Sequence, residues 1–74
     1  MQITVKLFAT LRRFHVKEFP LEISEGTTVG QVIETLELPD DEVAIIMING
    51  ISKKREVILL EQDVLALFPA VGGG

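Results

Sequence analysis

The feature that most constrains the fold is one segment with helical periodicity, residues 28–36, because the chain's other apolar segments have the patterns of strands. Thr28 begins this segment and Gln31 follows three residues later, the spacing of a capping box. A lone helix with one apolar face has to bury that face against a sheet, so the sequence predicts an α+β domain. The apolar residues at i, i+3, i+4 and i+7 are Val29, Val32, Ile33 and Leu36.

The ends and interior of this helix carry further signals. Leu38-Pro39 is expected to end it, since a proline disfavours helical geometry in the residue before it. Gly30 weakens the helix by up to about 1 kcal/mol relative to alanine. Its missing side chain is expected to permit close packing on the sheet.

Two strand patterns precede the helix. Residues 2–8 and residues 17–24 both alternate apolar and polar side chains, which is typical of half-buried strands. Pro20 removes one ladder donor from the second pattern and favours an edge strand or a bulge. Residues 9–15 are too few to predict a helix, so we expect a turn or single helical turn within an antiparallel hairpin.

Three further strands are predicted after the helix. Residues 43–48 form a nearly unbroken apolar run, typical of a central strand buried on both faces. The Asn-Gly pair at 49–50 predicts a hairpin turn, after which residues 51–52 begin a short return segment. Residues 56–60 are predicted as a short strand or helical turn, and residues 64–68 as the last strand. The order is strand, strand, helix, strand, short strand, strand.

Composition and charge exclude several function classes. The 74 residues suffice for one domain, and the absence of cysteine excludes disulfides, thiol nucleophiles and thiolate metal sites. A net charge of −4 argues against nucleic acid as a partner, since proteins that bind it usually carry a basic face. We find no signal-peptide pattern and no apolar run near the roughly 20 residues of a membrane span, so we expect a cytoplasmic protein without a membrane partner.

The polar residues form no catalytic constellation. His15 falls in a predicted loop, where a surface role is commoner than a ligand role, and no second histidine or cysteine completes a metal site. The acidic run at 40–42 is more typical of a solvated loop than of a carboxylate cluster. The basic residues either pair with an acidic partner surface or are ordinary surface charges, whose exposed pairs contribute about 0–1 kcal/mol. These basic residues are Arg12, Arg13, Lys53, Lys54 and Arg55.

The last seven residues, 68–74, join a Phe-Pro pair to three glycines. A glycine run adds little to a fold, but a backbone without side chains can enter a narrow channel and be approached closely. One interpretation is a frayed terminus or an expression remnant. The other is that residues 1–69 form a compact domain presenting a flexible tail, residues 70–74, whose terminal carboxylate is the working group. A strand that runs directly into the tail without a polar linker favours the second.

This ending and the order of elements resemble the ubiquitin-like β-grasp fold, and more closely the sulfur carriers of the MoaD/ThiS family. The sequence Phe68-Pro69-Ala70-Val71-Gly72-Gly73-Gly74 is similar to the Phe-Pro-Pro-Val-x-Gly-Gly ending of MoaD. Residues 5–12 are similar to the first strand and turn of MoaD-type carriers, and the turn at 48–50 lies where the family places it. Ala70 and the turn at 61–63 depart from the MoaD pattern, and a triple-glycine ending is common in ThiS, so the pathway stays open.

The resemblance implies a mixed sheet of four to five strands with one main helix on one face. It also implies a carrier, not an enzyme, with no bound cofactor. In the family, a ubiquitin-activating-type enzyme uses ATP to adenylate the terminal glycine, which matches Gly74, and a sulfur donor protein supplies the sulfur of a thiocarboxylate. A MoaD-like chain would be the small subunit of molybdopterin synthase, would bind the large subunit and would be monomeric when unpartnered. The residues expected to contact partners are Phe68, Pro69, Val71, Gly72 and Gly73.

Several alternatives stay open at this stage. Within the carrier hypothesis, the Phe-Pro pair and the N-terminal hairpin favour molybdopterin as the acceptor, and the alternative is a ThiS-like carrier for the thiazole of thiamine. The second hypothesis is a ubiquitin-like modifier that is joined through Gly74 to a lysine of a target protein. The third is a β-grasp binding module with an inert tail. Phe68 itself is either a docking residue or simply a core residue of the last strand.

Overall fold

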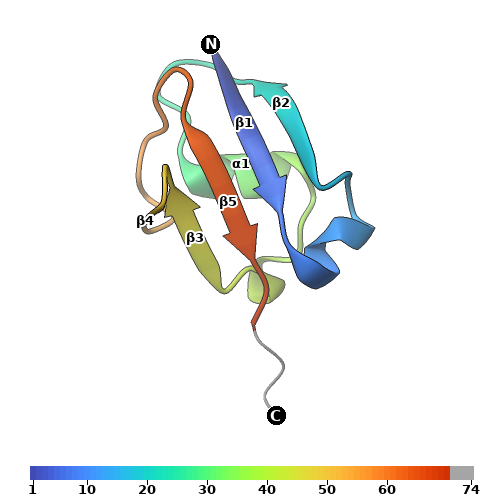
Figure 1. The fold of residues 1–74 in the computed structure, drawn as a ribbon. Helices are drawn as coiled ribbons and strands as arrows, with labels where there is room; N and C mark the ends of the chain where they lie inside the picture. Colours follow the sequence, from blue (N-terminus) through green and yellow to red (C-terminus); the bar gives the residue numbers. More distant parts are fainter. Residues whose placement is uncertain (71–74) are drawn as a thin grey trace.

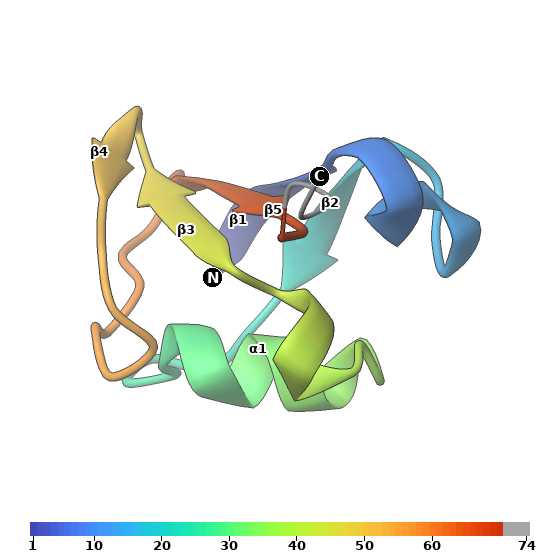
Figure 2. The same cartoon turned by 90° about the horizontal axis from the view of Figure 1, so that it is seen from below.

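The computed structural model describes residues 1–70, in which one α-helix packs across one face of a sheet (Figures 1 and 2). The predicted order of elements is confirmed. The expected partner-contacting residues Val71, Gly72 and Gly73, and Gly74 itself, lie outside the described residues. The elements are β1 (Gln2–Leu7), the 3-10 helix η1 (Ala9–Arg13), β2 (Glu18–Glu22), α1 (Val29–Thr35), the 3-10 helix η2 (Asp40–Glu42), β3 (Ile45–Ile48), β4 (Ile51–Ser52) and β5 (Val64–Phe68).

The five strands form one mixed sheet in the order β2-β1-β5-β3-β4. β1 pairs with β5 in parallel, and the other neighbours pair antiparallel. The predicted α+β class with a mixed sheet and one main helix is therefore confirmed. β5 lies in the middle of the sheet between β1 and β3, so the strand that leads to the chain's last residues is held on both sides (Figure 1).

The core lies between the sheet and α1. The alternation in β1 and β5 sends every second side chain toward the helix, and these inward residues are at most 1% exposed. The apolar face of α1 supplies the opposite wall, as its periodicity predicts. The fully buried side chains include Ile3, Val5, Leu7, Leu11, Val29, Val32, Leu59, Leu65 and Leu67.

The capping box at the start of α1 is confirmed. The Thr28 hydroxyl accepts a hydrogen bond from the Gln31 backbone N–H at 3.2 Å, and the Gln31 side chain accepts one from the Thr28 N–H at 2.9 Å. At the other end, the His15 Nε2 lies 2.7 Å from the carbonyl oxygen of Leu36, the C-cap residue. His15 also packs against the Phe19 ring, so it is half-buried and links the first hairpin to the helix end.

The prediction that residues 43–48 form a central strand buried on both faces is wrong. β3 begins at Ile45, and β4 lies outside it. Ile46 and Ile48 face the core, whereas Ile45 is 43% exposed on the opposite face. A single short helix covers only one face of the sheet (Figure 2), so half of this apolar run stays accessible.

The Asn-Gly turn after β3 is confirmed and also fastens the start of β5. Asn49 and Gly50 both have positive φ, 52° and 83°, as a two-residue type I′ hairpin requires. The Asn49 amide donates to Asp63 Oδ1 at 2.9 Å, and the Asn49 side-chain oxygen accepts from the Val64 N–H at 3.0 Å. Asp63 Oδ2 accepts a further bond from the Leu60 N–H, so this buried carboxylate closes the turn before β5.

Pro20 lies on an edge strand, as predicted, but it does not remove a ladder bond. The Leu7 N–H donates to the Lys17 carbonyl and the Ile23 N–H to the Met1 carbonyl, which sets the alternating bonded pairs of this hairpin. Pro20 is opposite Thr4, between bonded pairs, so its nitrogen faces away from β1. The proline therefore blocks the outer edge of the sheet at no cost to the pairing of β2 with β1.

Residues 56–60 form neither of the predicted elements. Leu59 is fully buried, but the segment makes only one isolated bridge, between Ile58 and Thr28. The Leu59 N–H donates to the Thr27 carbonyl at 2.9 Å, so the segment runs along the start of the helix. The burial of its residues alternates as in a strand, yet the neighbouring backbone is a helix N-terminus that offers no further ladder.

Gly30 packs against this same part of the chain and not against the sheet, contrary to expectation. Its N–H donates to the Arg55 carbonyl at 2.9 Å. A Cβ at residue 30 would lie 3.5 Å from that oxygen, an ordinary contact distance. The close approach therefore joins α1 to the segment after β4.

We predict that Val32→Asp unfolds the domain. Val32 is 1% exposed, and an unpaired carboxylate there costs about 4 kcal/mol or more, comparable with the whole stability of a domain of this size. Circular dichroism should show loss of the cooperative thermal transition. The control is Thr35→Asp, which adds the same charge to an exposed position of α1. An unchanged melt for Val32→Asp would contradict the placement of this helix face.

Candidate functional site

The candidate site lies where β5 ends and the chain leaves the sheet (Figure 1). Leu65 and Leu67 of β5 point into the core, whereas Ala66 and Phe68 point to the face without a helix. Phe68 is half-buried and is not part of the buried core of residues 1–70. The core alternative for Phe68 is therefore wrong, and its docking role stays a prediction.

Phe68 stacks on Phe8, a residue that the sequence analysis missed. The ring centroids are 4.3 Å apart and the rings are inclined by 13°. Phe8 directly follows β1, whose parallel register pairs Leu7 with Leu67, and the Phe8 N–H donates to the Leu67 carbonyl at 3.1 Å. The available signal was the break in alternation at position 8, which put a large apolar side chain on the outer face.

The two rings form part of an open hollow of about 350 Å³, which we call the tail-base hollow. Its walls come from the ends of β1 and β5, from η1 and from β3. Ala9 turns the chain into η1 with a positive φ of 53°. The lining is mostly apolar. It includes Phe68 and Pro69, the two described residues among those expected to contact partners. The lining residues are Phe8, Ala9, Thr10, Ile45, Phe68, Pro69 and Ala70.

The basic residues of η1 are anchored near this hollow. The Arg12 Nε donates to the Leu7 carbonyl at 2.8 Å, and the guanidinium carbon lies 5.6 Å from the centroid of the Phe8 ring. Arg13 pairs with Glu42 at 2.6 Å and lies over Phe14. Arg12 therefore places a cation beside the aromatic pair, while Arg13 ties η1 to η2.

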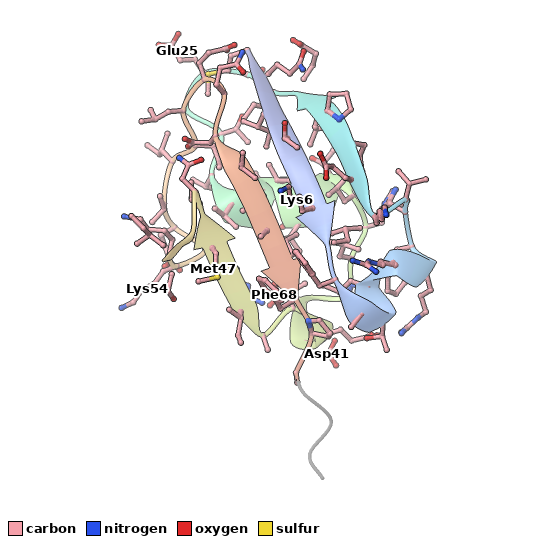
Figure 3. All side chains as sticks on the ribbon, viewed as in Figure 1. Lys6, Glu25, Asp41, Met47, Lys54 and Phe68 are labelled. Atoms are coloured by element: carbon pink, nitrogen blue, oxygen red, sulfur yellow. The ribbon has the colours of Figure 1, made fainter. Side chains whose placement is uncertain are left out.

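The hollow continues into the sheet face that carries no helix. The pairing aligns Lys6, Ala66, Met47 and Ser52 in one row across four strands. Figure 3 shows Lys6, Met47 and Phe68 along this face, which is turned away from α1. In this row Ala66 and Met47 are apolar, whereas Lys6 and Ser52 are polar, so the face has a mixed character and its apolar part lies next to Phe68.

The remaining candidates offer no chemistry of their own. In the acidic run at 40–42, Asp40 pairs with Arg55 at 2.9 Å and Glu42 with Arg13, so two of its three carboxylates hold structure together. Among residues 1–70, no group of three or more histidine or acidic side chains is arranged to hold a metal ion. No helix in that same part of the chain has the length and apolarity to cross a membrane.

Comparison with known families decides the classification. The model of the ThiS family matches residues 5–74. The chain belongs to the ThiS family. The resemblance to MoaD/ThiS carriers drawn from the sequence is thus confirmed, and membership supports a ubiquitin-like sulfur carrier or modifier, a carrier and not an enzyme. No curated protein matches the chain closely enough in sequence to count as a relative.

Solved structures agree with this classification. The structure of SAMP1 from Haloferax volcanii aligns over 100% of this chain and 100% of its own, at 24% identity and with a TM-score of 0.81. This similarity confirms the ubiquitin-like β-grasp fold. A putative molybdopterin converting factor subunit 1 from Pyrococcus furiosus is 27% identical over 95% of this chain and 98% of its own, with a TM-score of 0.77. Small archaeal modifier protein 1 from Methanosarcina acetivorans is 28% identical over 99% and 96%, with a TM-score of 0.69.

Adjacent residues of β5 should respond differently to truncation. Leu67→Ala leaves a cavity in the core and should lower the free energy of unfolding by about 2–5 kcal/mol. Phe68→Ala removes a stacked pair on the outer face and should cost about 1 kcal/mol. Chemical denaturation of both variants measures the difference. Equal losses would show that Phe68 belongs to the core.

Proposed function

We propose that this ThiS-family protein is a sulfur carrier whose Gly74 carboxylate is adenylated and then converted to a thiocarboxylate that donates sulfur in cofactor biosynthesis. The observation that carries the proposal is the geometry at the end of β5. The strand is anchored in the centre of the sheet, and the chain leaves it beside an exposed apolar hollow. A rigid strand followed by the sequence Val71-Gly72-Gly73-Gly74 suits a domain that presents a carboxylate to another protein's active site.

The chemistry explains why a partner enzyme is needed. A carboxylate is a poor acyl donor because its leaving group would be an oxide. An activating enzyme of the ubiquitin-activating type joins Gly74 to the AMP portion of ATP and releases pyrophosphate. The sulfur of a donor protein's persulfide then attacks the acyl carbon and displaces AMP, and cleavage of the sulfur–sulfur bond by a reducing thiol leaves the thiocarboxylate. The carrier contributes no catalytic side chain to these steps.

The described residues supply the docking part of this function. Phe68 and Pro69, together with Phe8, give a partner an apolar hold at the base of the tail. Val71 would extend that hold, and Gly72 and Gly73 would pass through a channel too narrow for side chains. Docking at the base of the tail would hold the carrier on its partner while Gly74 reacts, which is how binding away from the reacting atoms supports catalysis.

Molybdopterin is the acceptor pathway that we favour. The support is the likeness to the putative molybdopterin converting factor subunit from Pyrococcus furiosus, together with the Phe-Pro ending. In this role the chain would be the small subunit of molybdopterin synthase, monomeric until it binds the large subunit. Delivery of sulfur to the thiamine thiazole is the alternative within the same chemistry, because the matching family model is that of ThiS.

A protein modifier is the second candidate function, and a specific finding favours it. The modifier protein from Methanosarcina acetivorans is 28% identical over nearly the whole chain. Activation would again begin with adenylation of Gly74, but a lysine amine of a target would displace AMP and form an amide. Lysine-linked conjugates in the native host would identify this function, and a thiocarboxylate without conjugates would identify the carrier.

The deciding experiment is the intact mass of the protein purified from its own host under conditions that preserve thiocarboxylates. A species heavier by one sulfur-for-oxygen exchange, located in the peptide that contains Gly74, is the expected result. Incubation with ATP and the host's activating enzyme, followed by a mass shift of one adenylyl group, is the accompanying test. Failure of Gly74 to accept either group would overturn the proposal.

Gly74→Ala, or one added C-terminal residue, should abolish sulfur transfer while the thermal melt stays unchanged. The reason is that the change alters the reacting group and not the core. Gly30→Ala is the matched control, since its Cβ would meet only ordinary contacts inside the domain. Normal sulfur transfer by the protein with one added C-terminal residue would contradict both the carrier hypothesis and the modifier hypothesis.

A further inference from the structure

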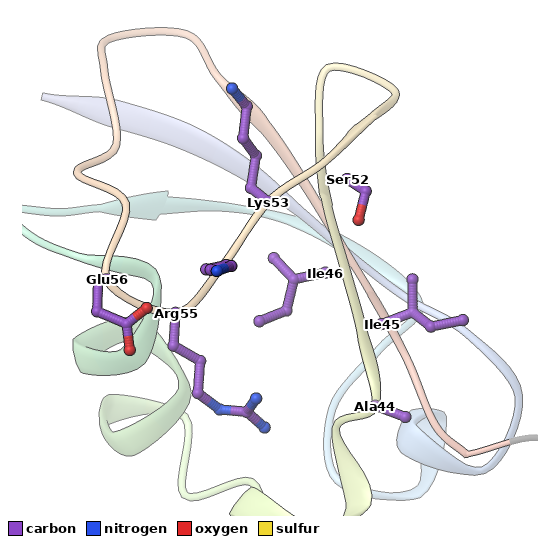
Figure 4. Close-up of a pocket in the computed structure, with 8 residues that line it drawn as sticks. Ala44, Ile45, Ile46, Ser52, Lys53, Arg55 and Glu56 are labelled. Carbon is purple, nitrogen blue, oxygen red and sulfur yellow. The ribbon is translucent and has the colours of Figure 1, made fainter.

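A second hollow, of about 350 Å³, lies at the edge of β3 where the short strand β4 ends (Figure 4). We call it the basic hollow. One wall is the beginning of β3, and the other is the segment that follows β4. Its lining residues are Ala44, Ile45, Ile46, Ser52, Lys53, Lys54, Arg55 and Glu56.

The basic hollow is held open by hydrogen bonds on both sides. The Lys53 N–H donates to the Ile46 carbonyl at 2.9 Å, after which the chain diverges from β3 (Figure 4). Further along, the Arg55 guanidinium donates to Asp40 Oδ1 at 2.9 Å and to the Val43 carbonyl at 2.7 Å. The walls are therefore fixed before any ligand binds, which lowers the entropic cost of binding.

Two cations beside this hollow are unused by the fold. Lys53 and Lys54 are exposed, and within residues 1–70 neither side chain takes part in an ion pair or a hydrogen bond. Arg55 is committed to Asp40 and Val43, and Glu56 is the one acidic residue in the lining. In a chain with 11 acidic and 7 basic residues, two adjacent free lysines give this hollow a charge opposite to that of the molecule.

The basic hollow also adjoins the tail-base hollow. Ile45 lines both, and it is 43% exposed on the sheet face that carries no helix. A protein seated at the base of the tail therefore reaches the basic hollow across one residue. This continuity indicates which class of molecule occupies it.

We propose that the basic hollow binds an acidic, extended segment of a protein partner, with an apolar side chain against the exposed Ile45 and flanking carboxylates at Lys53 and Lys54. The segment belongs to a partner that docks at the tail base, so the identity of the partner rests on the proposed function. The binding itself requires no chemistry at Gly74. Failure of sulfur transfer and failure of this contact are thus measured separately.

The probe is a pair of synthetic peptide pools, titrated into isotopically labelled protein and followed by amide chemical shifts. In one pool a central Val, Ile, Leu or Phe is flanked by Asp and Glu; in the other the same central residues are flanked by Lys and Arg. The acidic pool should shift amides of residues 44–46 and 52–56, and the effect should weaken as salt is raised. The basic pool should leave them unchanged.

Substitutions of the two lysines test whether they are the residues that bind the acidic peptides. Lys54→Glu and Lys53→Glu should each weaken binding of the acidic pool by about tenfold, and Lys54→Arg should retain it. Lys17→Glu is the matched control, because Lys17 is exposed and directly precedes β2. This strand forms the edge of the sheet opposite to β4. All three charge reversals change the net charge equally, so a general charge effect would lower the affinity to the same extent in each.

Three results would overturn the proposal. The first is no shift with the acidic pool. The second is a shift that maps elsewhere or persists in Lys53→Glu and Lys54→Glu. The third is tighter binding of a single-stranded DNA oligonucleotide at the same amides, which would assign the two lysines to a phosphate backbone.

Discussion

The parallel pairing of β1 with β5 is the interaction on which the rest of the structure depends. It joins the beginning of the chain to its end, through the register Thr4–Val64 to Leu7–Leu67. β2 is attached only to β1, and β3 only to β5 and β4, so these two central strands hold the sheet together. Parallel strands need a long crossover, and the intervening chain provides it with α1, whose apolar face covers the inward residues of both.

The same pairing creates the candidate site. Because the strands run in one direction, both end at the same edge of the sheet, and the residues that follow them meet there. Phe8 and Phe68 stack for this reason, although they are 60 positions apart in the sequence. Inward residues such as Leu67 stabilise the fold, while their outward neighbours are left for contact with other molecules. Alternate positions of one strand thus divide between the buried core and the outer face, where the docking role of Phe68 is proposed.

The sequence predicted correctly those structural features that are set by residues close together in the chain. The capping box, the Asn-Gly turn and the alternation of β1 each involve a few consecutive positions, and all three are confirmed. The glycine ending pointed to the family because its position and composition are unusual together. The errors concern contacts between distant segments. An apolar run at 43–48 does not reveal which face a helix will cover, and the apolar run at 57–60 is compatible with a strand but meets a helix N-terminus.

Arg55 illustrates the same limit. As one of three consecutive basic residues it looked like exposed surface charge, yet it donates to acceptors on Asp40 and Val43, 12 to 15 positions earlier. The three residues therefore divide by role, since Arg55 fixes the wall of the basic hollow and the two lysines remain available. Polarity in the sequence predicted exposure correctly for the lysines only. What distinguishes the arginine is the fork of several donors, which can satisfy two carbonyls and a carboxylate together.

Ile45 lines both hollows, so a substitution at this position cannot separate a contact at one hollow from a contact at the other. Its side chain contributes to both surfaces, so truncating it would weaken a partner's hold at the tail base and at the basic hollow together. Phe68 and Lys54 each line only one hollow. A partner that engages both hollows would lose affinity when either position is substituted, whereas a partner of one hollow would respond to one substitution only. That pattern distinguishes a single continuous interface from two separate ones.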